Sequence, residues 1–162
     1  MTPYQNNSFN NRGTIGFNNR SSQTQNAPRP PKPEDTVKVL PAFNVKTRSK
    51  ELFDTIAETC AKTIAESSES INKPTQLRRF YDELVMWNER ASISDEAFQN
   101  ALPFVYMMKS KAAYAKGRKN VDATFLDFIK TLIGQIEDKD TLNNAKLFME
   151  AMMGFYKQYK RD

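Results

Sequence analysis

The sequence predicts an all-α protein, a compact bundle of about five helices with a disordered N-terminal tail. From about Val37 onward, apolar residues recur at spacings of three and four, which places them on one face of a helix. Residues that cap or begin helices, such as Ser94 and Pro74, separate these runs. No run alternates between apolar and polar residues for long enough to indicate a β-strand.

Residues 1–35 differ from the rest of the chain in composition. They are rich in asparagine, glutamine and proline, and Ile15 is their one branched aliphatic residue. Such a segment cannot bury enough apolar surface to offset the entropy that ordering costs. We therefore expect disorder, and we divide the chain into an Asn- and Pro-rich leader at residues 1–45 and a helical bundle at residues 46–162.

The first two helical runs are amphipathic, with charged residues opposite an apolar face. The apolar faces comprise Leu52, Phe53, Ile56, Cys60 and Ile64 in the first run, and Leu77, Phe80, Tyr81, Leu84 and Trp87 in the second. We interpret Cys60 as a small core residue rather than a redox group. Pro74 suits the first turn of the second helix, where a backbone N–H has no intrahelical partner to lose.

The third run begins at Ser94, a good N-cap, and Asp95 and Glu96 follow where the helix dipole favours negative charge. Pro103 interrupts it, because proline lacks a backbone N–H and clashes with the preceding turn. We expect either a kink or a short helix followed by a new one near Pro103. Gly117 is placed to end the helix, since glycine best tolerates a left-handed C-terminal cap.

The fourth and fifth runs each carry a single narrow apolar stripe, as expected for helices with one buried side. The stripes comprise Phe125, Phe128, Ile129, Leu132, Ile133 and Ile136, and then Leu142, Ala145, Met149, Met152, Met153 and Tyr156. Short connections between helices of this kind are typical of a bundle.

The composition argues against an enzyme. The chain has no histidine, one cysteine and five scattered glycines, which excludes Ser-His-Asp and Cys-His hydrolases, an internal disulfide and phosphate-binding glycine loops. Carboxylates could in principle hold Mg²⁺, but they lie where helix caps and solvated faces place acids, so we expect no metal and no cofactor. These carboxylates are Asp122, Asp127, Asp138 and Asp140. Neither a secretory signal nor a run long enough to span a bilayer is present, so we expect a cytoplasmic protein without a membrane partner.

The excess positive charge is concentrated in one short segment. The chain has 24 Lys plus Arg and 19 Asp plus Glu, a formal net charge of +5. Residues 109–119 hold five cations and no acid, so the other 19 cations equal the acids in number. The five are Lys109, Lys111, Lys116, Arg118 and Lys119. The segment therefore accounts for the whole net charge.

A helical wheel places these cations on two flanks of a buried seam. Phe104, Met108, Ala112 and Ala115 point inward on this wheel, Lys109 and Lys116 lie on one flank and Lys111 lies on the other. Two rows of cations suit the backbone of a polyanion. They also suit a solvated helix face, and cations near a helix C-terminus stabilise its dipole without any ligand.

Two further features of the sequence have competing interpretations. Arg78 and Arg79 each have an acid four residues later, Asp82 and Glu83, so exposed intrahelical ion pairs are the default expectation. Tyr114 could stack on a base, but an aromatic residue at a helix margin more often belongs to the core.

Three segments resemble the small helical subunit of the type III-A CRISPR–Cas effector, the Csm complex. They are Thr75–Tyr81 (TQLRRFY), Tyr106–Arg118 (YMMKSKAAYAKGR) and Phe148–Lys157 (FMEAMMGFYK). Their order and spacing match, and the resemblance covers roughly residues 52–160. The Asn-rich leader departs from the pattern.

The resemblance implies a non-catalytic subunit of an antiviral ribonucleoprotein. Several copies would form a filament by self-association along the guide RNA and target RNA, beside a repeated backbone subunit and together with the large and other subunits. The family's basic contacts fall on Arg78, Arg79, Lys109 and Arg118, whereas Tyr114 and Gly117 match positions that shape the turn rather than touch RNA. We add Lys111, Lys116 and Lys119 to the predicted RNA-binding residues because of their positions in the basic segment, not because of the resemblance.

Two other functions remain compatible with a small, basic, helical chain. One is a DNA-binding regulator, although recognition helices usually offer Arg, Asn and Gln to base edges, whereas the cations here are mostly lysine. The other is a protein-interaction module whose basic loop docks an acidic partner.

Overall fold

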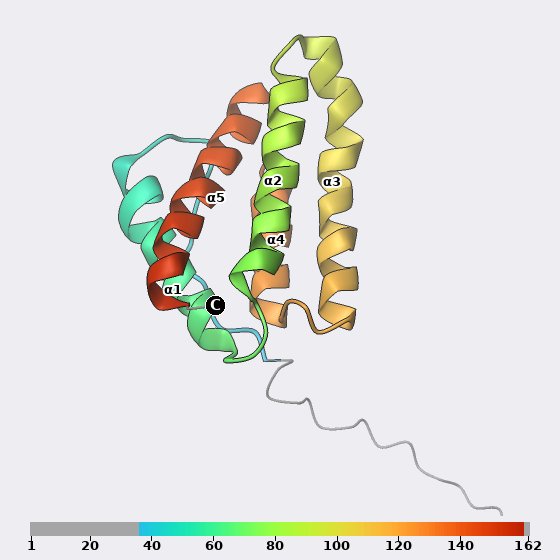
Figure 1. Ribbon diagram of the computed structural model, residues 1–162. Coiled ribbons are helices and arrows are strands. Elements are labelled where there is room, and N and C mark those ends of the chain that lie inside the picture. The colour runs from blue at the N-terminus through green and yellow to red at the C-terminus, as the bar shows by residue number, and fades with distance from the viewer. Residues whose placement is uncertain (1–35, 161–162) are drawn as a thin grey trace, which may run out of the picture. The chain divides into compact units, whose positions relative to one another are not determined.

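The computed structural model describes residues 36–160, so the disorder predicted for residues 1–35 lies outside the described part of the chain. The elements are the π-helical turn η2 (Leu52–Ile56), α1 (Ala57–Ser67), α2 (Pro74–Ala91), α3 (Asp95–Gly117), α4 (Ala123–Gly134) and α5 (Lys139–Tyr159) (Figure 1). No strand occurs among residues 36–160. The predicted all-α class and the five helices are confirmed.

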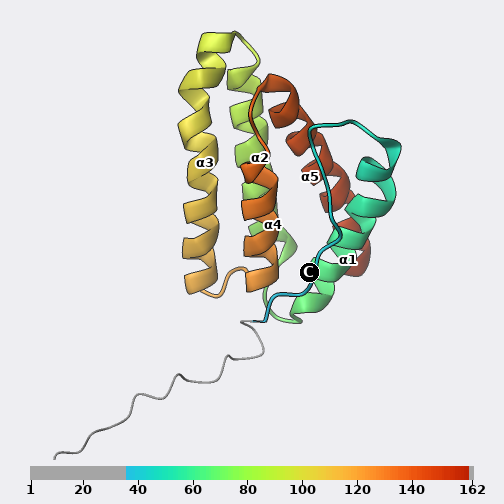
Figure 2. The same cartoon turned by 180° about the vertical axis from the view of Figure 1, so that it is seen from behind.

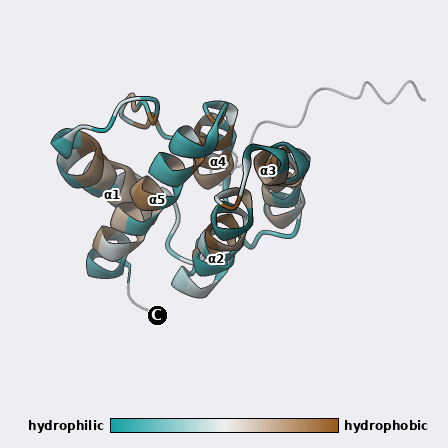
Figure 3. Ribbon diagram, turned by 90° about the horizontal axis from the view of Figure 1, so that it is seen from above, coloured by the Kyte–Doolittle hydropathy of each residue, from teal (hydrophilic) through white to brown (hydrophobic). Residues whose placement is uncertain are grey.

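The helices pack as a bundle in which α3 lies at an edge. α5 packs against α1 and α2, whereas α3 packs mainly against α2 and α4. The view from above places α1 and α3 at opposite edges, with α2, α4 and α5 between them (Figure 3). Among residues 36–160, no helix therefore covers the side of α3 that faces away from α2 and α4.

Aromatic and aliphatic side chains from α4 and α5 form the centre of the core. Phe125, Phe128, Phe148 and Met149 are each 0% exposed. The Phe128 and Phe148 rings lie 5.9 Å apart between centroids. Burial of one such side chain contributes on the order of 1.5–3 kcal/mol. The stripes predicted for these two helices thus lie in the core of the bundle.

The segment before the first helix is extended and packed. The Phe43 ring lies 4.8 Å from that of Phe148. Buried Val45 donates its N–H to Oε1 of Gln135 at 2.8 Å, and its carbonyl accepts from Nδ2 of Asn144 at 2.8 Å. Figure 2 shows this segment in blue-green, running along the bundle.

This packing changes two expectations for the start of the domain. Helix was expected from about Val37, but the first helical residue is Lys50. Pro41 gives a physical reason, since proline disfavours the helical conformation at the residue before it. In addition, Phe43 and Val45 pack against the bundle, so the packed part of the chain begins before the boundary expected between residues 45 and 46.

Pro103 does not divide α3. The helix is continuous from Asp95 to Gly117 and begins at Ser94, whose hydroxyl accepts from the Ala97 N–H at 3.0 Å, as predicted. Pro103 removes one hydrogen bond and its ring is exposed. Packing against α2 on one side and α4 on the other outweighs that loss, so of the two alternatives the short helix followed by a new one is wrong.

α3 ends at Gly117 as predicted, but the expected left-handed glycine cap is wrong. Gly117 does not have a positive φ, and the left-handed residue is Lys119, at φ 59°. The Lys119 N–H donates to the Lys116 carbonyl at 2.9 Å and the Asn120 N–H donates to the Ala115 carbonyl at 3.0 Å, which closes the helix as a Schellman motif. A lysine therefore occupies the position where glycine is usual.

A buried asparagine joins the ends of three helices. Asn72 is 0% exposed and donates from Nδ2 to the Ile64 carbonyl at 3.3 Å and to Oγ of Ser67 at 3.1 Å. Its Oδ1 accepts from the Asp122 N–H at 2.9 Å, and its carbonyl accepts from the Tyr156 hydroxyl at 2.5 Å. The end of α1, the start of α4 and the last turns of α5 are thereby held at one point.

Substituting this asparagine should destabilise the fold strongly. Asn72→Ala leaves the Asp122 N–H without its partner and places alanine at φ 59°, while the Ile64 carbonyl keeps its bond from the Ser67 hydroxyl. The unpaired buried N–H costs about 1–3 kcal/mol and the left-handed backbone about 1–2 kcal/mol, so we expect the free energy of unfolding to fall by roughly 2 kcal/mol or more. Urea unfolding followed by circular dichroism measures it.

Gly117→Ala is the matched control for that measurement. Gly117 is helical and an added Cβ would meet no atom within 4 Å, so alanine should stabilise the chain by about 0.5–1 kcal/mol. A loss below 1 kcal/mol for Asn72→Ala would show that Asn72 does not hold the three helix ends.

Candidate nucleic-acid interface

The cations predicted to contact RNA come from α2, from α3 and from the loop after α3, and they lie on different sides of these elements. Arg79, Lys111 and Arg118 gather between α2 and α3, Lys109 lies on the side of α3 next to α4, and Arg78 lies on the side of α2 next to α5. The predicted residues therefore do not form a single cluster.

A pocket of about 230 Å³ lies between α2 and α3, and we call it the α2–α3 pocket. Its walls include Gln76, Arg79, Glu83, Lys111, Tyr114 and Asn120. Arg118 adjoins it, because its Nη1 donates to the Tyr114 hydroxyl at 3.1 Å and its guanidinium lies 5.8 Å from the centre of that ring. Three cations thus line or adjoin a pocket that also holds one exposed aromatic ring.

One carboxylate offsets part of this charge. The Lys111 Nζ lies 2.5 Å from Oε1 of Glu83, and that oxygen also accepts from Nε1 of Trp87 at 3.3 Å. The expected pair between Arg79 and Glu83 is therefore not the one formed; within residues 36–160, no ion pair involves Arg79. The pocket keeps a net positive charge, since one carboxylate, Glu83, accompanies the three cations that line or adjoin it.

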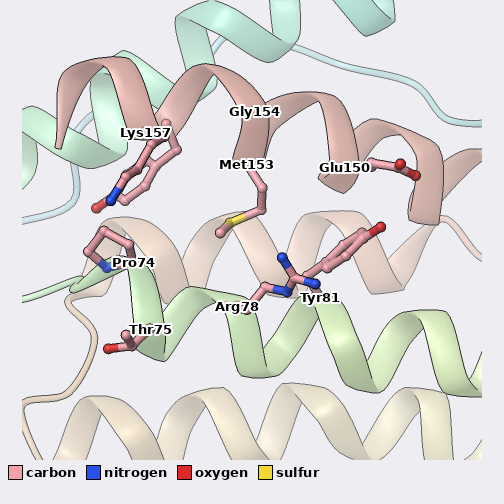
Figure 4. Close-up of a pocket in the computed structure, with 9 residues that line it drawn as sticks. Pro74, Thr75, Arg78, Tyr81, Glu150, Met153, Gly154 and Lys157 are labelled. Atoms are coloured by element: carbon pink, nitrogen blue, oxygen red, sulfur yellow. The ribbon is translucent and has the colours of Figure 1, made fainter. Parts of the chain in front are cut away.

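Arg78 faces a different surface, because neighbouring residues point about 100° apart on a helix. Its Nε lies 2.7 Å from Oδ1 of Asp82, which confirms the predicted ion pair, and this hydrogen bond raises the pKa of Arg78. The side chain lines a pocket of about 610 Å³ between α2 and α5, where Met153 points back toward it (Figure 4). Its guanidinium lies 5.1 Å from the centre of the Tyr81 ring.

Lys109 lies on the flank of α3 opposite Lys111, as the helical wheel predicts. Its Nζ is 4.4 Å above the centre of the Tyr106 ring and close to Gly134 of α4. The Tyr106 hydroxyl donates to the Ile136 carbonyl at 3.2 Å, which fixes the ring beneath the ammonium group. Lys116 is half-buried two turns further along the helix, and Lys119 is exposed in the loop.

The exposed face of α3 carries large apolar side chains that the sequence did not indicate. Tyr114 is 66% exposed, so its interpretation as partial core is wrong. Phe104, predicted to point inward, is 47% exposed and stacks on Trp87 at 5.0 Å between ring centroids. Met108 and Ala112 are buried as predicted. Only knowledge that α3 is an edge helix would have revealed the two exposed rings.

Two of the four candidate metal-binding carboxylates act as helix caps. Asp122 accepts from the Phe125 N–H at 2.9 Å and Asp138 accepts from the Thr141 N–H at 2.7 Å. The hydrogen bonds from Thr141 hold the pKa of Asp138 below its usual value. In the part of the chain that the structure describes, no three Cys, Asp or Glu residues are grouped so that they could hold a metal ion.

A family model described as Csm2 Type III-A matches residues 47–162. The chain belongs to this family. It is thus a small subunit of the type III-A CRISPR–Cas Csm complex, in agreement with the resemblance of its three segments. Neither the curated proteins nor the solved structures include a significant match. Between residues 36 and 160, the Csm2 chain has no helix that is long and apolar enough to cross a membrane.

The single cysteine should be chemically inert in the folded protein. Cys60 is 0% exposed, and burial raises its pKa to about 12, so the reactive thiolate is scarce at pH 8. We expect the native chain to react with Ellman's reagent at least about 100-fold more slowly than the same chain in 6 M guanidinium, which should release one thiol equivalent. Rapid reaction of the native chain would contradict the assignment of Cys60 to the core.

Proposed function

We propose that this Csm2 chain binds the sugar-phosphate backbone of guide and target RNA without sequence specificity and performs no catalysis. The observation that carries the proposal is the charge of α3 and its following loop. Residues 109–119 hold five cations and no acid, and they lie on an edge helix whose outer side is exposed. Such a surface supports neutralisation of phosphates with release of counterions.

The roles of the individual cations follow from their partners. Arg79, Lys109 and Arg118 contact aromatic rings or solvent rather than carboxylates within residues 36–160, so they bind phosphate at the least cost. Lys111 shares its charge with Glu83, and Lys116 and Lys119 extend the basic surface. Arg78 pairs with Asp82 on the other side of α2, so its substitution should weaken binding least.

The sequence of the RNA would be read by base pairing between guide and target rather than by this subunit. That division is general to RNA-guided effectors, and phosphate contacts carry no base information. Several copies would line the guide–target duplex, associating with one another, with the repeated backbone subunit and with the large and other subunits, in the cytoplasm.

Salt dependence tests this proposal. If about five phosphates are neutralised, the slope of log K against log salt for a single-stranded RNA should be near −3.5. Lys109→Gln combined with Arg118→Gln should reduce that slope by about 1.4, which corresponds to roughly 25-fold weaker binding at 0.1 M salt if the curves meet at 1 M. Fluorescence anisotropy with labelled RNA gives both quantities.

Lys50→Gln combined with Arg90→Gln is the matched control. It removes the same charge, and Arg90 rests on Trp87 at 5.1 Å much as Arg118 rests on Tyr114. We expect this control to bind RNA nearly as the wild type does. Equal losses in both variants, or a slope near zero, would reject the proposal. Preference for duplex DNA would favour a regulator, and ribonuclease-resistant capture of an acidic protein would favour an interaction module.

The carboxylate beside the pocket should limit RNA affinity. Glu83→Gln keeps hydrogen-bonding capacity toward Lys111 and Trp87 but removes a negative charge. A unit charge about 6 Å from a phosphate is worth roughly 0.7 kcal/mol in water, so binding should tighten about threefold at low salt. The gain should diminish as salt rises.

Glu96→Gln is the control for this charge change, because Glu96 is exposed at the other end of α3. The same anisotropy measurement should show little change for it. Unchanged or weaker binding by Glu83→Gln would place the phosphates away from the α2–α3 pocket.

A further inference from the structure

Tyr114 occupies an unusual position for a large aromatic residue. It is 66% exposed, and it comes from the central part of the basic segment rather than from its margin. The Arg118 guanidinium lies on one side of the ring and donates to its hydroxyl at 3.1 Å, so the side chain is held without being buried. An exposed ring fixed in this way resembles the platforms on which unpaired bases stack.

The pocket beside the ring has a size that suits one planar heterocycle. It measures about 230 Å³, below the range of roughly 300–1,000 Å³ that is usual for drug-sized ligands. Phe80 and Ala115 contribute apolar wall, and Tyr114 contributes an aromatic face. These surfaces favour stacking and apolar contact over the binding of a small hydrated anion.

Polar groups at the pocket can serve the edge of any base. Gln76 and Asn120 line it, and within residues 36–160 neither side-chain amide has a hydrogen bond to another residue. Each amide offers both a donor and an acceptor. Base edges differ in their pattern of donors and acceptors, so two adaptable amides tolerate several bases rather than select one.

The surrounding charge fits the phosphates of the same nucleotide and its neighbours. Arg79 and Lys111 line the pocket and Arg118 flanks it, against the single carboxylate of Glu83. A nucleotide is the ligand class that combines a flat aromatic part with anionic groups. Neither an acidic peptide nor free phosphate would use the exposed ring.

We infer that the α2–α3 pocket binds one unpaired nucleobase of the RNA, stacked on Tyr114, while Arg79 and Arg118 hold the adjoining phosphates. This inference rests on the proposed RNA-binding function and adds a specific contact to it. A base stacked inside a duplex cannot reach the ring, so the pocket takes a base that is single-stranded or turned out of the helix.

The test compares RNA with and without bases. The full chain is titrated against a 12-nucleotide oligo(A) RNA and against an abasic RNA with the same number of phosphates. Wild type should bind oligo(A) about 5- to 100-fold more tightly, the range expected for one base stacked on an aromatic ring. Tyr114→Ala should abolish that difference without changing affinity for the abasic strand, whereas Tyr114→Phe should retain most of it.

Met107→Ala is the matched control. Met107 is 50% exposed, lies on α3 seven residues before Tyr114 and does not line the pocket. It should leave both affinities unchanged. In parallel, the fluorescence of 2-aminopurine placed in the RNA should be quenched by wild type and not by Tyr114→Ala.

The outcomes separate this inference from the function on which it rests. If both RNAs bind equally and Tyr114→Ala changes neither affinity, the pocket binds no base, and backbone binding stands alone. If neither RNA binds, the proposed function fails as well. Circular dichroism of each variant establishes that the helices are intact.

Discussion

The buried side chain of Asn72 is the interaction on which the arrangement of this protein depends. It satisfies backbone groups at the ends of α1 and α4 and accepts the Tyr156 hydroxyl from α5 through its carbonyl. Its own N–H donates to the Asn120 carbonyl at 3.3 Å. The same residue that joins three helix ends therefore also positions the loop that walls the α2–α3 pocket, so stability and the candidate interface share one polar junction.

The second constraint is the place of α3 at the edge of the bundle. The buried side of α3 is narrow because, among the helices, mainly α2 and α4 pack against it. The remaining surface carries Met107 and Tyr114 together with cations, a combination that burial in the centre of a bundle would not permit. Contacts within the protein partly compensate this charge, because Lys111 pairs with Glu83 and Arg118 lies against the Tyr114 ring. The surface is thus positive, and these contacts reduce the repulsion between its cations.

Several expectations failed for a common reason. Pro103, Gly117 and Tyr114 each have a strong local preference, for a helix break, a left-handed cap and a partly buried position respectively. In each case the tertiary surroundings of the residue override its local preference. Packing on two sides keeps the helix continuous through Pro103, hydrogen bonds from the loop place the left-handed conformation at Lys119, and the absence of any helix outside α3 within residues 36–160 leaves Tyr114 exposed.

The sequence by itself determined the helical class, the apolar faces of α4 and α5, the cap at Ser94, and the concentration of charge in residues 109–119. These are properties of a short stretch of chain, so periodicity and composition are sufficient to identify them. The tertiary structure alone decided which cation meets which carboxylate, which side of α2 each arginine faces and how Phe43 packs. Those choices depend on contacts between residues far apart in sequence, about which local pattern carries no information.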